Sequence, residues 1–334
     1  MIIQLKQDIQ EADKLFMEQV LNQLKIEFYP VQTQKGTYLI CTPKQEFDIR
    51  KIGHLKGIND VHRVSGNHKM VSHKWKVDRT VLDLGDGVVI GDGNLSMMAG
   101  PCSIESEEQI DKVVEALKAN GVRIMRGGVY KPRTSPYSFR GLGMVGLKMF
   151  YKACNKNGIK IITEIMESSQ IEDMLPYVDI FQVGARNAQN FNLLEALGEI
   201  DKPVLLKRGI SGTIDELLYS AEYVFKNGNE KIILCERGIR TFESAYRNTL
   251  DLNAVPILKE KSHLPVVVDP SHGIGLRQHV AQMALAGAVV GADGLLVEIH
   301  ETPEKAATDG QQTLDFKEFE RLMTKLNQLK EIIK

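Results

Sequence analysis

Cationic side chains recur in this sequence directly after short apolar runs. Arginine and lysine gathered at one place bind anions, and the planar arginine fork matches phosphate and carboxylate oxygens. The whole chain has a formal net charge of −1, so any positive site must be local. We therefore expect a pocket for a substrate with two or more anionic groups, built from Arg126, Lys131, Arg133, Arg186, Lys207 and Arg237.

A second group of residues has the chemistry of metal ligands. Thiolate, imidazole and carboxylate together form a mixed ligand set for a divalent transition metal. The residues are far apart in the sequence, so their spacing gives no support. Taken singly, Cys102 is more typical of a small buried hydrophobic residue. His272 taken singly is more typical of a loop histidine whose hydrogen bonds are satisfied. As a set at the ends of neighbouring strands they favour a metal site made by Cys102, His272, Glu298 and Asp309.

Internal ion pairing is the alternative explanation for the cationic group. Glu164, Glu236 and Asp269 also lie at the ends of apolar runs and could serve as partners. Three carboxylates cannot neutralise six cations, so we expect some positive charge to remain for a ligand.

The elements that must position these residues are short apolar runs that alternate with amphipathic helical stretches. This rhythm is typical of parallel α/β proteins, and eight such units favour a closed (β/α)8 TIM barrel, whose active site lies at the carboxyl ends of the strands. No GxGxxG follows the first run, which argues against a dinucleotide-binding sheet. The runs span residues 95–100, 122–126, 159–164, 178–183, 203–207, 231–236, 264–269 and 293–298.

The first seventy residues are expected to form a separate unit, with the barrel domain at 71–334. Strands at 2–5, 25–31, 37–41 and 60–64 and helices at 11–24 and 47–52 give the order βαββαβ of a small ferredoxin-like domain. Residues 80–93 resemble a β-hairpin that turns at Gly85, Asp86 and Gly87 and could close the bottom of the barrel.

Composition narrows the class of protein. Hydrophobic residues make up 43% and charged residues 25%, as in ordinary globular proteins. The near-neutral charge gives no reason to expect nucleic acid or membrane partners. The N-terminal segment lacks the pattern of a signal peptide, and no apolar run is long enough for a membrane span. The four cysteines, Cys41, Cys102, Cys154 and Cys235, show no CxxC spacing, and we expect free thiols in the cytoplasm.

Seven motifs carry a resemblance to a known family. They are AGPCSIES (99–106), KPRTSPYSF (131–139), QVGARNAQN (182–190), LLKRG (205–209), CERGIRTF (235–242), DPSHG (269–273) and the EIH and DG pair (298–310). Together they resemble 3-deoxy-D-arabino-heptulosonate 7-phosphate (DAHP) synthases of type I beta, whose barrel follows a ferredoxin-like domain. The resemblance implies condensation of phosphoenolpyruvate with erythrose 4-phosphate, the first step of the shikimate pathway to aromatic amino acids.

The resemblance also implies roles for individual residues. Cys102, His272, Glu298 and Asp309 would bind a divalent ion of the manganese, iron, cobalt or zinc class. Phosphoenolpyruvate would be held by Arg126, Lys131, Arg186, Lys207 and Arg237, with backbone groups at Gly184 and Ala185. Arg133 and Thr134 would bind the phosphate of erythrose 4-phosphate. Lys131 would donate a proton to the new alkoxide, and Glu164 is a candidate for activating water by position only.

Three further expectations follow from the resemblance. The N-terminal domain would mediate feedback inhibition by tyrosine or phenylalanine, although a packing or assembly role fits its sequence equally well. A homo-oligomer, in particular a tetramer, is expected. The segment Ile274, Gly275, Leu276 and Arg277 departs from relatives, which puts the packing of that loop in question.

Two other functions are weighed against this one. The nearest enzyme alternative is 3-deoxy-D-manno-octulosonate 8-phosphate synthase, although KPRTS at 131–135 favours the four-carbon acceptor. A catalytically silent binding protein is the alternative outside enzymes, and the intact set of ligand residues argues against it.

Overall fold

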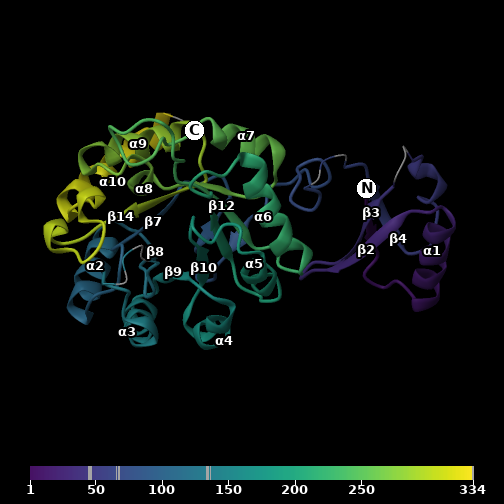
Figure 1. Ribbon diagram of the computed structural model, residues 1–334, viewed down its shortest axis with the longest axis horizontal. Helices are drawn as coiled ribbons and strands as arrows, with labels where there is room; N and C mark the ends of the chain where they lie inside the picture. Colours follow the sequence, from purple (N-terminus) through teal and green to yellow (C-terminus); the bar gives the residue numbers. More distant parts are fainter. Residues whose placement is uncertain (44–46, 65, 67, 133–134, 136, 333–334) are drawn as a thin grey trace.

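A computed structural model describes residues 1–43, 47–64, 66, 68–132, 135 and 137–332. Eight parallel strands close a barrel in the order β10-β11-β12-β13-β14-β7-β8-β9 (Figure 1). Each strand overlaps one of the eight predicted runs, so the predicted TIM barrel is confirmed. The strands are β7 (Ser96–Gly100), β8 (Ile124–Arg126), β9 (Lys160–Ile165), β10 (Ile180–Val183), β11 (Val204–Lys207), β12 (Ile232–Glu236), β13 (Val266–Val268) and β14 (Gly294–Glu298).

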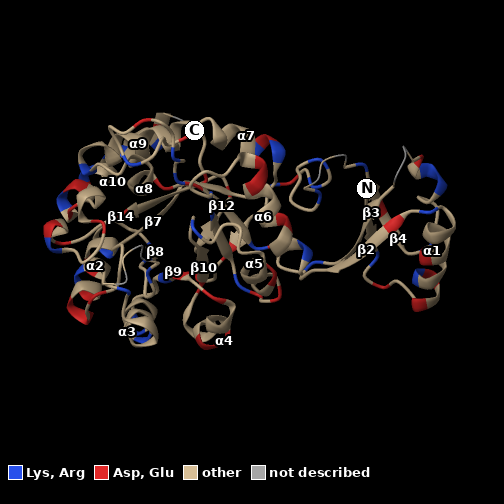
Figure 2. Cartoon of the chain, in the orientation of Figure 1, with Lys and Arg blue, Asp and Glu red and all other residues tan. Residues whose placement is uncertain are grey.

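Helices surround the barrel and bury one stripe each against it. Their N-termini are capped where the chain offers Ser or Thr: Ser106 caps α2, and Thr213 with Glu216 forms a capping box on α6. Lys and Arg are interleaved with Asp and Glu along the outer helices (Figure 2). The helices are α2 (Glu107–Ala119), α3 (Gly143–Lys156), α4 (Ile171–Met174), α5 (Phe191–Gly198), α6 (Ile214–Lys226), α7 (Ala254–Lys261), α8 (Pro270–Ile274), α9 (Arg277–Val289) and α10 (Phe316–Ile332).

A β-hairpin closes the end of the barrel at which the strands begin. Its strands, β5 (Leu82–Asp83) and β6 (Val89–Ile90), pair antiparallel. Leu82 and Ile90 are buried in the same cluster as the side chains that fill the barrel interior. Asp86 at the turn pairs with Lys160 at the start of β9, at 2.9 Å. The opposite end of the barrel, where the strands finish, is left for a site.

The N-terminal residues form a four-stranded antiparallel sheet in the order β2-β3-β1-β4, with α1 packed on one face (Figure 1). The expected second helix is reduced to a 3-10 turn, η1 (Ile49–Lys51), because the segment is too short to propagate an α-helix. The last strand also begins two residues earlier than predicted. The other elements are β1 (Ile2–Leu5), α1 (Glu11–Gln23), β2 (Glu27–Gln32), β3 (Thr37–Thr42) and β4 (Ile58–His62).

The segment between the small sheet and the barrel is held by a compact set of buried contacts, here called the joint: Met70, Trp75, Thr80, Glu222 and His263. The Glu222 carboxylate accepts a hydrogen bond from the Met70 amide at 2.8 Å. Met70 O accepts one from Trp75 Nε1 at 2.7 Å and lies 2.9 Å from His263 Nε2. His263 Nδ1 lies 2.7 Å from Thr80 Oγ1. A neutral imidazole with its proton on Nε2 satisfies both contacts.

Within the described ranges, no helix combines the length and the apolar character needed to cross a lipid bilayer.

Candidate active site

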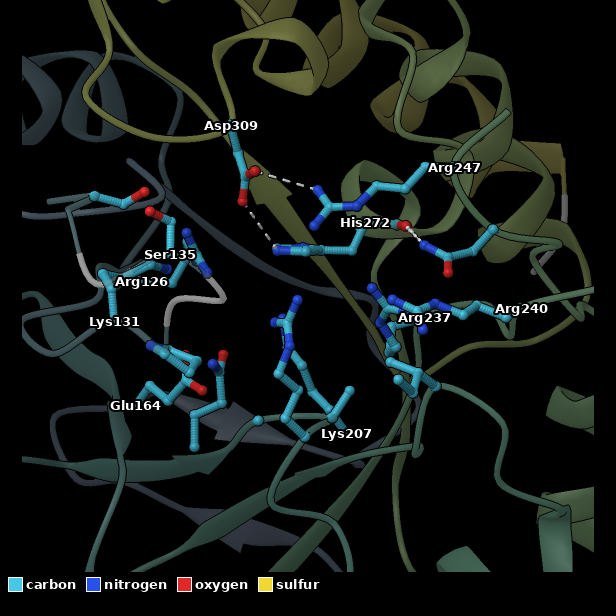
Figure 3. A pocket seen from close by; sticks show the side chains of 18 residues that line it. Arg126, Lys131, Ser135, Glu164, Lys207, Arg237, Arg240, Arg247, His272 and Asp309 are labelled. Carbon is cyan, nitrogen blue, oxygen red and sulfur yellow. Dashed lines mark hydrogen bonds and ion pairs between the residues drawn. The ribbon is translucent and has the colours of Figure 1, made fainter. Parts of the chain in front are cut away.

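A cavity of about 390 Å³ lies at the end of the barrel where the strands finish (Figure 3). Most of its wall is polar, and positive residues from several different strands and loops face it. This is the position at which TIM barrels carry their active sites. Its lining comprises Arg126, Lys131, Pro132, Ser135, Ser138, Glu164, Gln182, Gly184, Ala185, Arg186, Lys207, Ile210, Arg237, Arg240, Arg247, Asn248, His272 and Asp309.

Cys102, His272, Glu298 and Asp309, here called the metal-ligand group, converge on one side of this cavity. Cys102 Sγ lies 3.2 Å from Asp309 Oδ2. His272 Nε2 lies 3.6 Å from Glu298 Oε1 and 3.8 Å from Asp309 Oδ2. The convergence follows from barrel closure, which places β14 between β13 and β7. Cys102, Glu298 and Asp309 each place one ligand atom within 4.8 Å of the others, and His272 Nε2 lies beside the two carboxylates.

Without a cation the Cys102 thiol is protonated and the His272 imidazole is neutral. Burial, followed by the neighbouring Glu298 carboxylate, raises the pKa of the Cys102 thiol to about 12. A cation bound there would displace the thiol proton, as metal–thiolate bonds require. Burial lowers the pKa of His272, which keeps the imidazole neutral and able to ligate. His272 Nδ1 lies 2.8 Å from Asp269 Oδ2, and a carboxylate behind a ligating histidine fixes the ring orientation.

The backbone at Asp309 is held in an unusual conformation. Its φ angle is +53°, in the left-handed region that residues other than glycine rarely adopt. Asp309 O accepts a hydrogen bond from Thr313 Oγ1 at 2.9 Å, which supports the turn. Such strain persists where the surroundings demand a particular side-chain position, often at functional sites. Together with the buried sulfur, imidazole and carboxylate donors, this geometry fits a divalent transition metal.

The positive residues divide into those with an acidic partner and those without one. Arg126 pairs with Glu298 at 3.0 Å, and Lys207 with Asp269 at 2.7 Å. Lys131 Nζ donates to Cys102 O at 3.1 Å. In the described part of the chain, no carboxylate pairs with Arg237, which donates to Gly238 O at 3.1 Å. Internal pairing therefore accounts for only part of the positive charge.

Unused donors remain on two of these arginines. The buried side-chain nitrogens without a hydrogen-bond partner include Arg126 Nε and Arg237 Nε, among the residues that the structure describes. Burial lowers the pKa of Arg237, which measures the cost of holding its charge away from water. Buried donors of this kind are rare unless a ligand satisfies them. An anion in the cavity would do so.

The expected partner Glu236 lies outside this arrangement. It pairs instead with Arg208 at 2.8 Å, and Arg208 also pairs with Asp251 at 2.9 Å. Arg208 was not among the predicted residues, because two adjacent cations at the end of β11 cannot be told apart by residue type. The alternation of side chains along a strand sends Lys207 and Arg208 to different surroundings.

Two glycines allow close packing at the cavity wall. A Cβ atom on Gly184 would lie 2.0 Å from Glu164 Oε1, and one on Gly128 would lie 2.8 Å from Lys131 Cδ. Gly184 therefore lets Glu164 stand against the end of β10. Gly128 lets Lys131 fold back toward Cys102. Arg186, next along the chain from Ala185, is exposed and lines the cavity.

Several cavity residues were missed by sequence reasoning. Arg240, Arg247 and Asn248 come from the loop after β12, and Gln182 from β10. The positive residues of that loop were a usable signal, because it follows a barrel strand. Arg133 and Thr134, expected to bind the acceptor phosphate, lie outside the described residues.

The loop from Ile274 to Arg277, whose sequence departs from that of relatives, is well packed. Gly275 ends α8 with a φ of +69°, a conformation suited to glycine. Arg277 pairs with Glu304 and Glu318, each at 2.6 Å, and with Asp315 at 2.9 Å. The loop is therefore tied to α10, which answers the question about its packing.

Comparisons with known proteins agree with the fold and the resemblance. The model of the DAHP synthetase I family matches residues 72–334. Phospho-2-dehydro-3-deoxyheptonate aldolase of Thermotoga maritima is 50% identical over 279 residues, which cover 84% of this chain and 82% of that protein. A crystal structure of DAHP synthase from Thermotoga maritima has a TM-score of 0.80 at 44% identity, covering 99% of this chain and 97% of that chain.

The octulosonate enzymes are more distant. A 2-dehydro-3-deoxyphosphooctonate aldolase of Syntrophobacter fumaroxidans is 31% identical over 267 residues, covering 74% of this chain and 91% of that protein. The resemblance stated from the motifs is confirmed. The chain belongs to the DAHP synthetase I family.

Proposed function

We propose that this chain is a metal-dependent DAHP synthase that condenses phosphoenolpyruvate, D-erythrose 4-phosphate and water to DAHP and inorganic phosphate. This reaction is the first step of the shikimate pathway. One observation carries the proposal: a buried group of sulfur, imidazole and carboxylate donors stands beside a cavity whose arginines have unused donors. Family membership supports the reaction, and this arrangement supports an anionic substrate bound beside a metal ion.

Phosphoenolpyruvate is proposed to lie against the positive wall of the cavity. Arg186, Lys207 and Arg237 would bind its phosphate, with backbone N–H groups at Gly184 and Ala185. Arg126 and Lys131 would hold its carboxylate end. Bidentate contacts of this kind fix both position and orientation, so that C3 of the enol faces the acceptor carbonyl.

The metal-ligand group would hold a divalent ion of the manganese, iron, cobalt or zinc class next to the acceptor aldehyde. When bound, such an ion supplies Lewis-acid polarisation of a carbonyl oxygen. Lys131, which lines the cavity with its Nζ 3.1 Å from Cys102 O, would donate a proton as the aldehyde oxygen becomes a hydroxyl. Glu164 also lines the cavity and remains our candidate for activating the water that adds at C2. Collapse of the resulting intermediate releases phosphate by C–O cleavage.

A phosphate-release assay with two aldoses tests the proposal. The enzyme is reloaded with Mn²⁺ after chelation and supplied with phosphoenolpyruvate and either erythrose 4-phosphate or arabinose 5-phosphate. We expect rapid phosphate release with the four-carbon sugar, abolished by chelator and restored by Mn²⁺. A clear preference for the pentose would favour the octulosonate reaction, and chelator-insensitive turnover would contradict the metal requirement.

We propose further that residues 1–70 act as a regulatory or assembly unit of a homo-oligomer, a tetramer by family resemblance, with tyrosine or phenylalanine as inhibitor. We place the protein in the cytoplasm, in keeping with its four free, buried cysteines. Initial rates of the full-length enzyme with each amino acid test the regulatory role. An enzyme that ignores both would leave the unit with packing or assembly alone.

A further inference from the structure

Asp309 presents its two carboxylate oxygens to different neighbours. Oδ2 faces the metal-ligand group, 3.2 Å from Cys102 Sγ and 3.8 Å from His272 Nε2. Oδ1 points away from the group and lies 3.3 Å from Arg247 Nη1 (Figure 3). Arg247 thus contacts the oxygen that faces away from the metal-ligand group.

Glu298 shows the same division. Its Oε1 lies 3.6 Å from His272 Nε2 and accepts a hydrogen bond from Arg126 Nη1 at 3.0 Å, whereas its Oε2 accepts one from Gln312 Nε2 at 2.7 Å. Gln312 is fully buried, and its own Oε1 accepts a hydrogen bond from Arg247 Nη1. One connected pair of side chains therefore holds the outward oxygens of both carboxylates.

The loop that carries Arg247 is fixed to the helix that carries His272. Arg247 N donates to Ile274 O at 3.1 Å, and Asn248 Nδ2 donates to His272 O at 2.7 Å. The stem of Arg247 crosses Gly275 so closely that a Cβ there would lie 2.2 Å from Arg247 Cβ. The loop after β12 thereby touches three of the four members of the metal-ligand group, directly or through Gln312.

We propose that Arg247 and Gln312 form a brace, a pair of positioning residues that fixes the orientation of Asp309 and Glu298 and so sets the affinity and coordination of the bound cation. This inference rests on the proposed function, because it assumes that the metal-ligand group binds a divalent ion. Outer contacts that orient metal ligands typically change metal affinity by about 10- to 100-fold when removed.

A purely electrostatic role for Arg247 makes the opposite prediction. Removing a positive charge 3.3 Å from Asp309 makes the site more negative, which by itself favours a cation. Loss of orientation instead weakens binding, because the carboxylate is then free to rotate away from the ion. Gln312→Met separates the loss of charge from the loss of orientation. It removes the hydrogen bonds of Gln312 without changing the net charge of the site.

The test is metal binding by the full-length protein after chelation. Mn²⁺ is titrated with the free ion followed by electron paramagnetic resonance, and Co²⁺ with its visible absorption recorded. We expect Arg247→Ala and Gln312→Met each to raise the Kd for Mn²⁺ about 10- to 100-fold and to alter the cobalt ligand-field bands. Arg247→Lys, which keeps a stem over Gly275, should fall between wild type and Arg247→Ala. The double variant should lose less than the two single losses combined, because the residues act in one chain.

Arg321→Ala, at an exposed position of α10, is the control for loss of one arginine charge and should match wild type. Unchanged Mn²⁺ affinity and cobalt spectra in Arg247→Ala and Gln312→Met, or tighter binding by Arg247→Ala, would overturn the brace. A variant that does not fold is replaced by Arg247→Lys, whose wild-type affinity and spectrum would overturn it equally. Failure of the wild type to bind either ion would instead overturn the proposed metal-dependent function on which the brace rests.

Discussion

The cavity at the carboxyl end of the barrel, here called the mouth, and the joint next to the N-terminal sheet differ in whether their buried polar groups have partners within the chain. At the joint, Glu222 receives two backbone N–H groups, and both ring nitrogens of His263 have partners. At the mouth, Arg126 and Arg237 keep buried Nε donors without partners among the described residues. The joint is complete within the chain, whereas the mouth needs a ligand to be complete.

Two arginines on adjacent strand ends make the same contrast at close range. Arg208 follows β11 and pairs with Glu236 and Asp251, so its charge is used in holding the chain together. Arg237 follows β12, faces the cavity and has no carboxylate partner among the described residues. Both arginines are buried, so the difference between them lies in whether carboxylates pair with the side chain.

The largest expected effect is the loss of the structural arginine. Arg208→Met should destabilise the fold by about 3–5 kcal/mol, because Glu236 would remain buried without its counterion. Urea unfolding followed by circular dichroism measures it. Adding Glu236→Gln to the variant should recover part of the loss. Stability close to wild type in Arg208→Met would show that the pair is dispensable and would remove one half of the contrast.

Next in size is the loss of the sulfur donor at the mouth. Cys102→Ser should reduce metal content and lower kcat by about 100-fold or more, because a hydroxyl is a poor replacement for thiolate. Unfolding of the chelated protein should change little, since the side chain makes no structural ion pair. Metal analysis with activity assays provides the check. Wild-type metal content and turnover would count directly against the ligand assignment.

A smaller effect is expected from the exposed arginine of the cavity. Arg186→Ala should raise the KM for phosphoenolpyruvate by about 10- to 100-fold. This is the change expected when one charge-assisted hydrogen bond to an anion is lost. The unfolding free energy should stay near wild type because Arg186 is exposed. Steady-state kinetics with Arg321→Ala as control measure the change. An unaltered KM would remove Arg186 from the phosphate site.

The smallest effect concerns the joint and its pH dependence. Burial lowers the pKa of His263 to about 3 from the ordinary histidine value of 6.5. Between these values the unfolded chain binds the proton and the folded chain does not, so stability falls as the pH drops below about 6.5. The contribution is at most about 1.4 kcal/mol per pH unit. His263→Gln should flatten this part of the profile measured by urea unfolding, and parallel profiles for both proteins would contradict the assignment.

Sequence periodicity was enough to predict the architecture, because burial and strand spacing repeat locally. Eight apolar runs identified the eight barrel strands, and barrel closure explains why Cys102 and Glu298 meet. The prediction of a second helix at 47–52 in the N-terminal unit was wrong, because a 3-10 turn, Ile49–Lys51, formed there instead. Local pattern predicts the type of element better than its length.

The parts of the site that escaped prediction depend on contacts between distant segments. Nothing in the local sequence distinguishes Arg208 from Lys207, or reveals that Arg247 reaches Asp309 and Gln312 across the mouth. The left-handed backbone of Asp309 is equally invisible to residue type. These features arise only when loops from different strands are packed against one another.

The most direct test of the central claim is a paired measurement on Arg237→Met. Its unfolding free energy without ligand and its affinity for phosphoenolpyruvate are determined together with those of wild type. We predict stability equal to or above wild type, because an unpaired buried charge is removed, and a loss of affinity of about 10- to 100-fold. A variant that is strongly destabilised yet binds phosphoenolpyruvate normally would contradict the claim that the mouth holds its unpaired cations for an anionic substrate.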